Sequence, residues 1–413
     1  MSYPDSVRYL YSLGNELKAG AKWGLERMQM LLAALANPER GQRFIHVAGT
    51  NGKGSTCAII ASILQASSYR TGLYTSPHLI EPTERIQINN EPVTPEEFVQ
   101  AFEAVHAAAE NLETPPSYFE TVTAMAFLTF RERCDISVIE VGLGGRLDAT
   151  NVIEPELCVI TPIAYDHEAY LGNTLQSIAA EKAGILKPGV PVVMARQLPA
   201  AEAVIAERAR QLGSRIIRTQ ETRVRNIELF PRGAMFMIGQ DAFECGLAGK
   251  HQIENATAAI LACRELGIGI EAIQRGLRHV RWPGRLEIVS WNPNFVLDGA
   301  HNPAAAEALA EYIRAFCRGK PVWMVYGAMR DKAIEEVTAQ LFPLADRVIA
   351  TAPDFPRALR PEAIIELAHR PDATVTHSIA EAIAVARTAP REAIVFFTGS
   401  LFVVGEARRL LLT

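Results

Sequence analysis

A glycine-rich loop is the part of this sequence whose residue types most clearly suit chemistry. It joins a strand-like run at residues 44–47 to a helix-like stretch at residues 57–64. Glycines let backbone N–H groups approach phosphate oxygens, and the N-terminus of the following helix attracts an anion. The loop consists of Gly49, Thr50, Asn51, Gly52, Lys53, Gly54 and Ser55. We predict that it binds a nucleoside triphosphate; a glycine-rich turn without a ligand is the alternative.

The side chains and the spacing of the loop refine this prediction. Lys53 supplies positive charge, and a hydroxyl at Ser55 or Thr56 can reach a phosphate-bound Mg²⁺. The spacing differs from the standard phosphate loop, because Val47 occupies the place of its first glycine. In addition, Gly54 separates Lys53 from Ser55. The loop is therefore a variant of the standard pattern.

Acidic and imidazole side chains follow two other strand-like runs. Glu140 comes directly after residues 136–139, and Asp166 and His167 follow residues 158–161. The carboxyl ends of parallel strands meet at one edge of the sheet, where α/β proteins bind ligands. Carboxylates and neutral imidazoles both bind metal ions. We expect Glu140 to bind Mg²⁺ and His167 to bind a metal or phosphate; a surface acid and a structural histidine are the alternatives.

A similar polar cluster ends a strand in the second half of the chain. The run at residues 295–297 is followed by Asp298, His301 and Asn302, and Pro303 suits the first turn of a helix. Asn302 is suited to cap that helix. Capping gives no reason for Asp298 and His301 to lie at the strand end, so these two are candidate functional residues.

The order of the elements predicts an α/β fold with two domains. Short apolar runs alternate with longer amphipathic stretches, as in parallel strands joined by crossover helices. We expect residues 1–288 to form an ATPase domain with a parallel central sheet and a small antiparallel appendage at residues 224–245. Residues 282–284 break the helical pattern. Residues 289–413 would form a smaller, Rossmann-like α/β domain.

Composition excludes several classes of protein. A net charge of -5 over 413 residues argues against general binding of nucleic acid, and no apolar run is long enough for a membrane helix. The first residues lack the pattern of a secretory signal, so we expect a cytoplasmic protein. The six cysteines are scattered without a CxxC pair, which argues against disulfides and cysteine-bound metal. A monomer is the default expectation.

Short blocks spread along the chain occur in the same order in one enzyme family. They lie at residues 49–55, 74–79, 84–86, 117–120, 140–151, 166–167, 181–185, 283–285, 298–303 and 398–400. In these blocks the chain resembles the folylpolyglutamate synthase and dihydrofolate synthase family over nearly its whole length. The variant spacing of the phosphate loop agrees with this resemblance.

The resemblance implies an ATP-dependent ligase that joins a carboxylate to an amine. The folate carboxylate would take the γ-phosphoryl group, and the amine of L-glutamate would then displace phosphate from the acyl phosphate. The implied substrates are tetrahydrofolate or its polyglutamates, and also 7,8-dihydropteroate. ATP would lie between the domains, and the second domain would close over the substrate and exclude water.

The resemblance also assigns roles to individual residues. The catalytic residues are Lys53, Glu140, His167 and Lys182. The ligands of two Mg²⁺ ions are Thr75, Glu140, His167 and Ser55. ATP is bound by residues 49–55 together with Asn255, Arg285 and Asp298. The substrate is bound by Ser117, Tyr118, Phe119, Glu120, Leu147, Asp148, Ala149 and His301.

Two of these assignments have structural alternatives. Lys182 matches a lysine that the family carries as a carbamate, which would turn a cation into an anion beside Mg²⁺; a surface lysine on a helix is the alternative. Tyr118 and Phe119 suit stacking on a pterin ring, although core packing also accounts for Phe119. Residues 20–23 match the pterin side as well, but they depart from the more acidic pattern of some bifunctional members.

Two rival functions remain at this point. A Mur-type cell-wall peptide ligase shares the fold and the acyl phosphate route, but such enzymes usually carry an additional N-terminal UDP-binding domain, and only 48 residues precede Gly49 here. A nucleotide-dependent binding protein without ligase activity is the other rival. It leaves Arg285, Asp298 and His301 unexplained.

Overall fold

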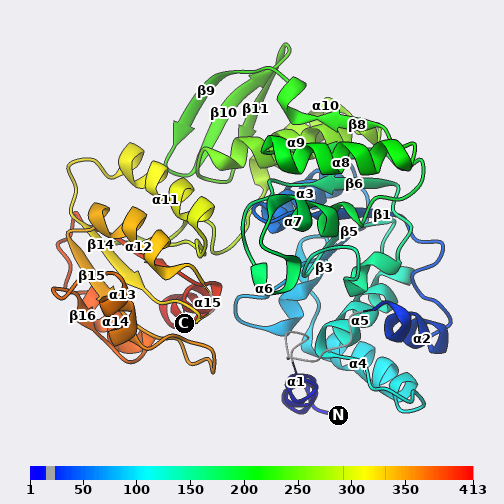
Figure 1. Cartoon of the computed structure of the whole chain (residues 1–413), viewed down its shortest axis with the longest axis horizontal. Coiled ribbons are helices and arrows are strands. Elements are labelled where there is room, and N and C mark those ends of the chain that lie inside the picture. The colour runs from blue at the N-terminus through cyan, green and yellow to red at the C-terminus, as the bar shows by residue number, and fades with distance from the viewer. Residues whose placement is uncertain (15–23, 292, 331, 413) are drawn as a thin grey trace. The chain divides into compact units, whose positions relative to one another are not determined.

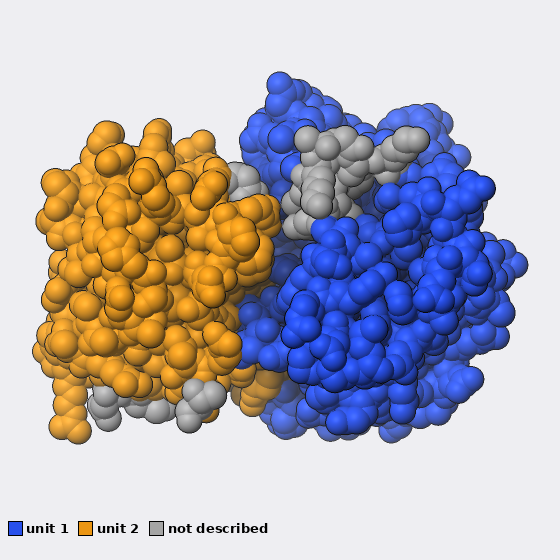
Figure 2. Space-filling view, turned by 90° about the horizontal axis from the view of Figure 1, so that it is seen from below, with its two compact units in different colours: residues 1–223, 254–279 blue, residues 224–253, 280–413 orange. Residues whose placement is uncertain are grey.

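The computed structural model describes residues 1–14, 24–291, 293–330 and 332–412. They form two compact units, which Figure 2 colours separately. Unit 1 comprises Met1–Arg223 and Glu254–His279, and unit 2 comprises Val224–Ile253 and Val280–Thr413. The chain therefore passes between the units three times, whereas we expected one division after residue 288.

Local contacts explain where these passages fall. The segment that follows Arg223 packs with unit 2, since Tyr312 Oη donates to the Pro231 carbonyl oxygen at 2.9 Å. The helix that ends at His279 packs with unit 1, because Ser62 Oγ donates to the Gly276 carbonyl oxygen at 2.8 Å. This helix lies against the helix Lys53–Ala66, and at Gly276 the two are so close that a Cβ would lie 2.4 Å from Ile63 Cα.

Unit 1 is built on an eight-stranded sheet in the order β4-β3-β2-β5-β1-β6-β7-β8 (Figure 1). Its strands are β1 (Phe44–Ala48), β2 (Thr71–Tyr74), β3 (Ile86–Ile88), β4 (Glu91–Pro92), β5 (Ile136–Glu140), β6 (Leu157–Ile160), β7 (Val192–Met194) and β8 (Ile216–Arg218). The strands from β2 to β8 in this order run parallel, and β3 and β4 extend one side antiparallel. Every residue of β1, β5 and β6 is buried, as their continuous apolar runs predict.

Helices cover this sheet, and the apolar core lies between the helices and the sheet. They are α1 (Tyr3–Ser12), α2 (Glu26–Ala34), α3 (Lys53–Ala66), α4 (Pro95–Ala109), α5 (Tyr118–Arg133), α6 (Glu168–Leu171), α7 (Leu175–Ala183), α8 (Pro199–Gln211), α9 (His251–Glu265) and α10 (Ile270–His279). Short 3₁₀ helices are η1 (Pro82–Arg85), η2 (Ala149–Val152) and η3 (Thr219–Glu221). One apolar cluster joins α1, α2, α4 and α5 to β2 and β5, and another joins α7 and α8 to β6 and β7.

Unit 2 contains two sheets. The predicted antiparallel appendage has the order β11-β10-β9, with β9 (Val224–Phe230), β10 (Gly233–Ile238) and β11 (Asp241–Cys245). The second sheet has the order β12-β13-β17-β14-β15-β16, with β12 (Glu287–Trp291), β13 (Asn294–Leu297), β14 (Val322–Tyr326), β15 (Arg347–Ala350), β16 (Thr374–Val375) and β17 (Ile394–Thr398). Its strands are parallel except β12, which pairs antiparallel with β13.

Five helices and one 3₁₀ helix accompany the six-stranded sheet in the part of unit 2 that is described. They are α11 (Pro303–Phe316), α12 (Ile334–Leu341), α13 (Pro361–Leu367), α14 (Ile379–Ala386), α15 (Leu401–Leu412) and η4 (Phe342–Leu344). Asn302 caps α11 as predicted, because its Oδ1 accepts from Ala305 N at 2.9 Å. All six cysteines are free thiols. Across the described ranges, every helix is too short or too polar to cross a bilayer.

Candidate active site

The phosphate loop connects β1 to α3, and its glycines are required by its conformation. Gly49 and Gly52 have φ angles of +147° and +86°. A Cβ on Gly49 would lie 1.9 Å from Thr161 Oγ1, and one on Gly52 would lie 2.2 Å from Asn255 Oδ1. Neither position therefore tolerates a side chain. The same contact places the amide of Asn255, a predicted nucleotide ligand, against the loop.

The loop uses its backbone N–H groups in two ways. Those of Thr50 and Asn51 both donate to the Pro162 carbonyl oxygen at 3.1 Å, so they hold the loop against the segment after β6. The helix α3 begins at Lys53, earlier than the sequence suggested. Helix N-termini leave backbone N–H groups without an intrahelical acceptor, so the first turn of α3 is suited to bind an anion.

Two lysines approach the loop from different elements. Lys53 Nζ donates to the Thr50 carbonyl oxygen at 3.3 Å. Lys182 lies on α7, is only 5% exposed, and its Nζ donates to the Gly49 carbonyl oxygen at 2.9 Å. The surface alternative for Lys182 is therefore excluded. Burial, followed by the charge of Lys53, lowers the pKa of Lys182 to about 7, while Asp166 and Asp148 act in the opposite direction.

Glu140 ends β5 at the same edge of the sheet. The register pairs Val47 with Glu140 and Tyr74 with Ile139, so the residues after β1 and β2 reach this level. Ser76 N donates to Glu140 Oε2 at 3.1 Å, which places the segment after β2 beside the carboxylate. This segment begins with Thr75, another predicted metal ligand.

The donor set at this edge fits Mg²⁺. Ser55, Thr75 and Glu140 are buried and offer oxygen atoms, which Mg²⁺ prefers as ligands. Within the described residues, no three His, Cys, Asp or Glu side chains gather into a metal cluster. Mg²⁺ normally takes only one or two protein carboxylates and completes its shell with water and phosphate oxygens. A single carboxylate with two hydroxyls matches that pattern.

The segment that carries His167 is tied to the phosphate loop. Thr50 Oγ1 donates to the Ala164 carbonyl oxygen and accepts from Ala164 N, both at 3.1 Å. His167 has a φ of +53°, and its backbone N–H donates to Asp166 Oδ1 at 2.9 Å. The structure therefore brings the loop, Lys182 and the segment of Asp166 together within unit 1.

The residues predicted to bind the pterin have evident structural roles. Ser117 and Glu120 form the capping box of α5, with Glu120 N donating to Ser117 Oγ at 3.3 Å and Ser117 N to Glu120 Oε2 at 2.8 Å. Phe119 is buried, and its ring lies so close to Gly142 that a Cβ there would meet Phe119 Cζ at 2.4 Å. Core packing therefore accounts for Phe119. Tyr118 stacks on Tyr11 instead of facing open space.

Asp148 organises the loop after β5, where Leu147 and Ala149 flank it. Its Oδ2 accepts from Leu143 N at 2.8 Å, and its Oδ1 accepts from Thr150 N at 3.0 Å. Burial raises the pKa of Asp148, and these hydrogen bonds oppose that shift. The predicted pterin segment at residues 20–23 lies outside the described residues.

The predicted residues of unit 2 gather at the carboxyl end of β13. Asp298 is buried and accepts from Leu286 N and Ala300 N, both at 3.0 Å. Burial raises the pKa of Asp298, and the charge of Arg285 opposes the rise. His301 Nδ1 lies 2.8 Å from the Gly299 carbonyl oxygen. A Cβ on Gly299 would lie 2.4 Å from Arg285 Nη1, so the three candidate side chains surround this glycine's segment.

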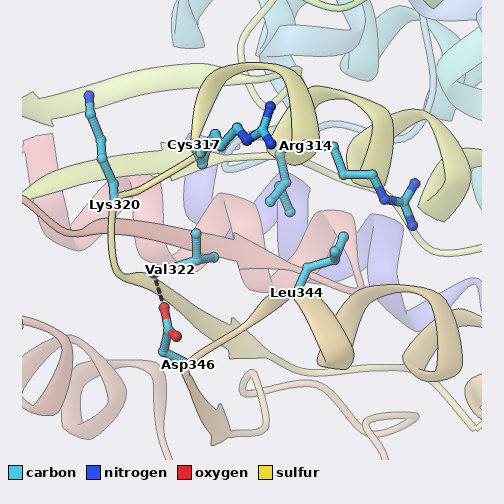
Figure 3. A pocket seen from close by; sticks show the side chains of 8 residues that line it. Arg314, Cys317, Lys320, Val322, Leu344 and Asp346 are labelled. Atoms are coloured by element: carbon cyan, nitrogen blue, oxygen red, sulfur yellow. Dashed lines mark hydrogen bonds between the residues drawn. The ribbon is translucent and has the colours of Figure 1, made fainter.

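Unit 2 also has an open pocket of about 530 Å³ (Figure 3). Its lining residues are Ile313, Arg314, Cys317, Arg318, Lys320, Val322, Leu344 and Asp346. The pocket lies where β14 and β15 begin, whereas Asp298 follows the end of β13. The Asp346 carboxylate accepts a hydrogen bond from Val322 N at 2.7 Å. None of the predicted site residues lines this pocket.

Sequence reasoning missed several groups that shape the site. Ser76, which donates to Glu140, adjoins the predicted ligand Thr75, so its place in the block at residues 74–79 was a usable signal. Pro162, which accepts from the loop, is separated from it by more than a hundred residues and belongs to no motif. Thr161, which excludes a side chain at Gly49, gave no signal either.

Comparison with known proteins places this geometry among ligases. Residues 47–263 match the model of the Mur ligase middle domain, and residues 284–401 match that of the Mur ligase glutamate ligase domain. A Bacillus subtilis protein named dihydrofolate synthase/folylpolyglutamate synthase is 37% identical, with 99% of both chains covered. The structure of Mycobacterium tuberculosis folylpolyglutamate synthase complexed with ADP and AMPPCP is 32% identical over 99% of both chains, with a TM-score of 0.90. A structure of E. coli FolC in complex with DHPP and ADP is 31% identical, covers 98% of this chain and 97% of that one, and has a TM-score of 0.87.

Proposed function

Because the chain belongs to the folylpolyglutamate and dihydrofolate synthase family of Mur ligases, we propose that it joins L-glutamate to folates at the expense of ATP. The resemblance read from the ordered sequence blocks is confirmed, since the B. subtilis relative matches 99% of the chain. The structural observation that carries the proposal is the convergence of the phosphate loop, Glu140 and Lys182 at one edge of the unit 1 sheet.

The geometry suits acyl phosphate chemistry. The substrate carboxylate attacks the γ-phosphorus of ATP, ADP leaves, and the glutamate amine then attacks the acyl carbon and expels phosphate. Phosphoryl transfer needs positioning and charge stabilisation more than covalent help from the protein. The first turn of α3 and Lys53 supply N–H donors and positive charge at the phosphates. The hydrogen bonds of Thr50 to Pro162 and Ala164 hold the loop against the segment after β6.

Mg²⁺ would be held by Ser55, Thr75, Glu140 and His167. When bound, it neutralises phosphate charge during transfer. Ser76 N fixes one oxygen of Glu140, which orients the carboxylate for this role. In unit 2, Arg285 and Asp298 are proposed nucleotide contacts, and His301 is a proposed substrate contact. Their support is their convergence at the carboxyl end of β13.

Lys182 is proposed to be carbamylated. Its burial beside the phosphate loop favours the neutral amine, which is the form that attacks CO₂. With a pKa of about 7, the amine is mainly protonated at about pH 6 and mainly neutral at about pH 8, so carbamate formation should rise with pH across this range.

Removal of CO₂ is expected to lower turnover, and bicarbonate should restore it. The Lys182→Arg variant cannot form a carbamate and should lose about 100-fold in kcat.

The carbamate itself is measured by NMR of protein incubated with ¹³C-bicarbonate. A carbonyl signal should appear in the wild type and be absent in Lys182→Arg. The matched control is Lys187→Arg, since Lys187 is also partly buried and its Nζ donates to the Asn151 carbonyl oxygen at 2.9 Å. An unchanged signal in Lys182→Arg would rule out this residue as the carbamate.

The proposed function is tested by following phosphate release from ATP and L-glutamate. Tetrahydrofolate, 7,8-dihydropteroate and a UDP-muramoyl substrate are offered separately. We expect release only when both L-glutamate and a pterin substrate are present, and we expect it with tetrahydrofolate and with dihydropteroate. No release with either pterin would contradict the proposal. Release with the UDP-muramoyl substrate alone would identify a cell-wall ligase, and ATP binding without any release would identify a binding protein.

We further propose a cytoplasmic monomer that acts on small molecules without nucleic acid or membrane partners. The net charge of -5 supports the absence of a nucleic-acid role. Six free cysteines, five of them buried, suit a reducing compartment.

A further inference from the structure

Arg85 is a buried cation that pairs with no acidic side chain in the part of the chain that the structure describes. It ends η1 and is 8% exposed. Among the described residues, the only hydrogen bond of its side chain runs from Nε to His78 Nδ1, at 2.8 Å, and it forms no ion pair. By contrast, Arg27 is more exposed and still pairs with Glu120 at 3.1 Å. Because a buried charge is costly unless it is paired, the state of Arg85 calls for an explanation.

The neighbours of Arg85 hold its guanidinium in place without neutralising it. The guanidinium carbon lies 5.1 Å from the centroid of the Tyr118 ring. The Tyr11 ring stacks on Tyr118, with centroids 5.7 Å apart and planes inclined by 6°. Burial and the charge of Arg85 lower the pKa of His78 to about 3, so this imidazole is neutral. Its Nδ1 accepts from Arg85, and its Nε2 lies 3.2 Å from Tyr11 Oη.

Tyr118 presents a second polar group without an acceptor. Its hydroxyl oxygen is buried and has no hydrogen-bond partner within the described part of the chain. Such a group normally costs stability, since buried hydroxyls are almost always satisfied. The Arg85 guanidinium, which lies over the Tyr118 ring, and the Tyr118 hydroxyl are therefore donors with N–H and O–H groups that lack acceptors among the described residues. Their natural complement is an anion with two acceptor oxygens.

This pair adjoins the proposed catalytic edge. Thr75 N donates to the Arg85 carbonyl oxygen at 3.1 Å, and the next residue, Ser76, donates to Glu140. In the proposed function, the first turn of α3 and Lys53 bind the phosphates of ATP. A carboxylate fits the pair better, because a guanidinium binds the two oxygens of a planar carboxylate in a bidentate manner. A pterin and an aminobenzoyl ring carry no negative charge, so a folate is anionic through its carboxylates.

We propose that Arg85 and Tyr118 bind a carboxylate of the folate substrate. The inference rests on the proposed function and adds two contacts to it. Arg85 supplies charge-assisted N–H donors, and Tyr118 supplies the hydroxyl donor while its ring supports the guanidinium. Tyr118 then contributes to substrate binding through its oxygen, and its ring is already occupied by Tyr11 and Arg85.

Binding of tetrahydrofolate and of its α,γ-diamide, each measured without ATP, tests the proposal. The wild type should prefer tetrahydrofolate by about 10- to 100-fold, the range for charge-assisted hydrogen bonds. Arg85→Gln should reduce that preference to near unity, and Arg85→Lys and Tyr118→Phe should reduce it partly. Tyr3→Phe is the matched control, because it removes a hydroxyl that bonds Glu81 in the neighbouring loop, and it should keep the preference.

Thermal unfolding separates binding from a structural role. Tyr118→Phe removes an oxygen that has no hydrogen-bond partner among the described residues, so the variant without ligand should unfold at the same or a higher temperature while it binds tetrahydrofolate more weakly. A preference that stays at the wild-type value in Arg85→Gln and Tyr118→Phe would overturn the inference. So would a change confined to the KM for L-glutamate, which would assign the carboxylate to that substrate. A wild type that prefers tetrahydrofolate but releases no phosphate would contradict the proposed function alone.

Discussion

Replacement of Lys53 by alanine is expected to lower glutamate-dependent phosphate release by at least about 1,000-fold, as for other losses of charge stabilisation in phosphoryl transfer. Lys53 is the first residue of α3, and its Nζ now bonds the Thr50 carbonyl oxygen at 3.3 Å. A side chain on this flexible stem can turn from the carbonyl to the phosphates when ATP binds. The loss should appear in kcat, measured at saturating ATP, folate and L-glutamate.

The control for this variant is Lys187→Ala. Lys187 also donates to a backbone carbonyl, that of Asn151, but it follows α7 and is not among the residues proposed to contact ATP. We expect the control to keep kcat within about threefold, since no charge at the phosphates is removed. Circular dichroism should give the same helix content for both variants. A Lys53→Ala protein that turns over at the wild-type rate would remove this residue from the proposed mechanism.

Much of the fold was predictable because its strands and helix ends carry strong local signals. Fully buried runs such as β1 and β5 read as continuous apolar segments, and the helix after Asn302 begins where its cap and Pro303 place it. The strand β12 was missed because it follows the break at residues 282–284 and pairs only with its neighbour β13. The expected division after residue 288 therefore falls inside a strand.

The site was predictable to the level of its blocks but not of its contacts. The loop, Glu140 and the segment of His167 could be placed at one sheet edge because parallel strands end together. The use of two loop N–H groups by Pro162 depends on a contact across more than a hundred residues. The burial of Lys182 depends on how α7 packs, and whether Arg85 has an acidic partner among the described residues depends on all of its neighbours there. Local sequence carries none of these three facts.

Phe119 illustrates the same limit in a residue that the resemblance named. An aromatic pair in a matching block suggests stacking on a ring-shaped substrate. In the structure Phe119 packs against Gly142, and a larger residue at that glycine would collide with it. The hydroxyl of its neighbour Tyr118 is buried and has no hydrogen-bond partner among the described residues. Two adjacent residues of similar type therefore have different environments, which only the tertiary contacts distinguish.

Glu140→Gln should lower kcat by about 100- to 1,000-fold and raise the Mg²⁺ concentration needed for half-maximal activity, because metal-site carboxylates supply charge that an amide does not. The change preserves volume and keeps an acceptor oxygen for Ser76 N, which now bonds Oε2 at 3.1 Å. The buried environment and the neighbouring strands β1 and β2 should therefore remain as they are. The measurement is phosphate release over a series of Mg²⁺ concentrations at saturating substrates.

The matched control for this last variant is Glu156→Gln. It makes the same change in the same sheet, but at the end where the parallel strands begin, directly before β6. Glu156 N donates to the Phe44 carbonyl oxygen, and the side chain pairs with Arg43 on the surface. Surface pairs contribute little, so kcat and the Mg²⁺ requirement should both stay at wild-type values. If Glu140→Gln instead lost activity without any shift in the Mg²⁺ requirement, the carboxylate would act on the substrate and not on the metal. If both variants had the same kcat and Mg²⁺ requirement, the carboxyl ends of β1, β2 and β5 would not be the catalytic site.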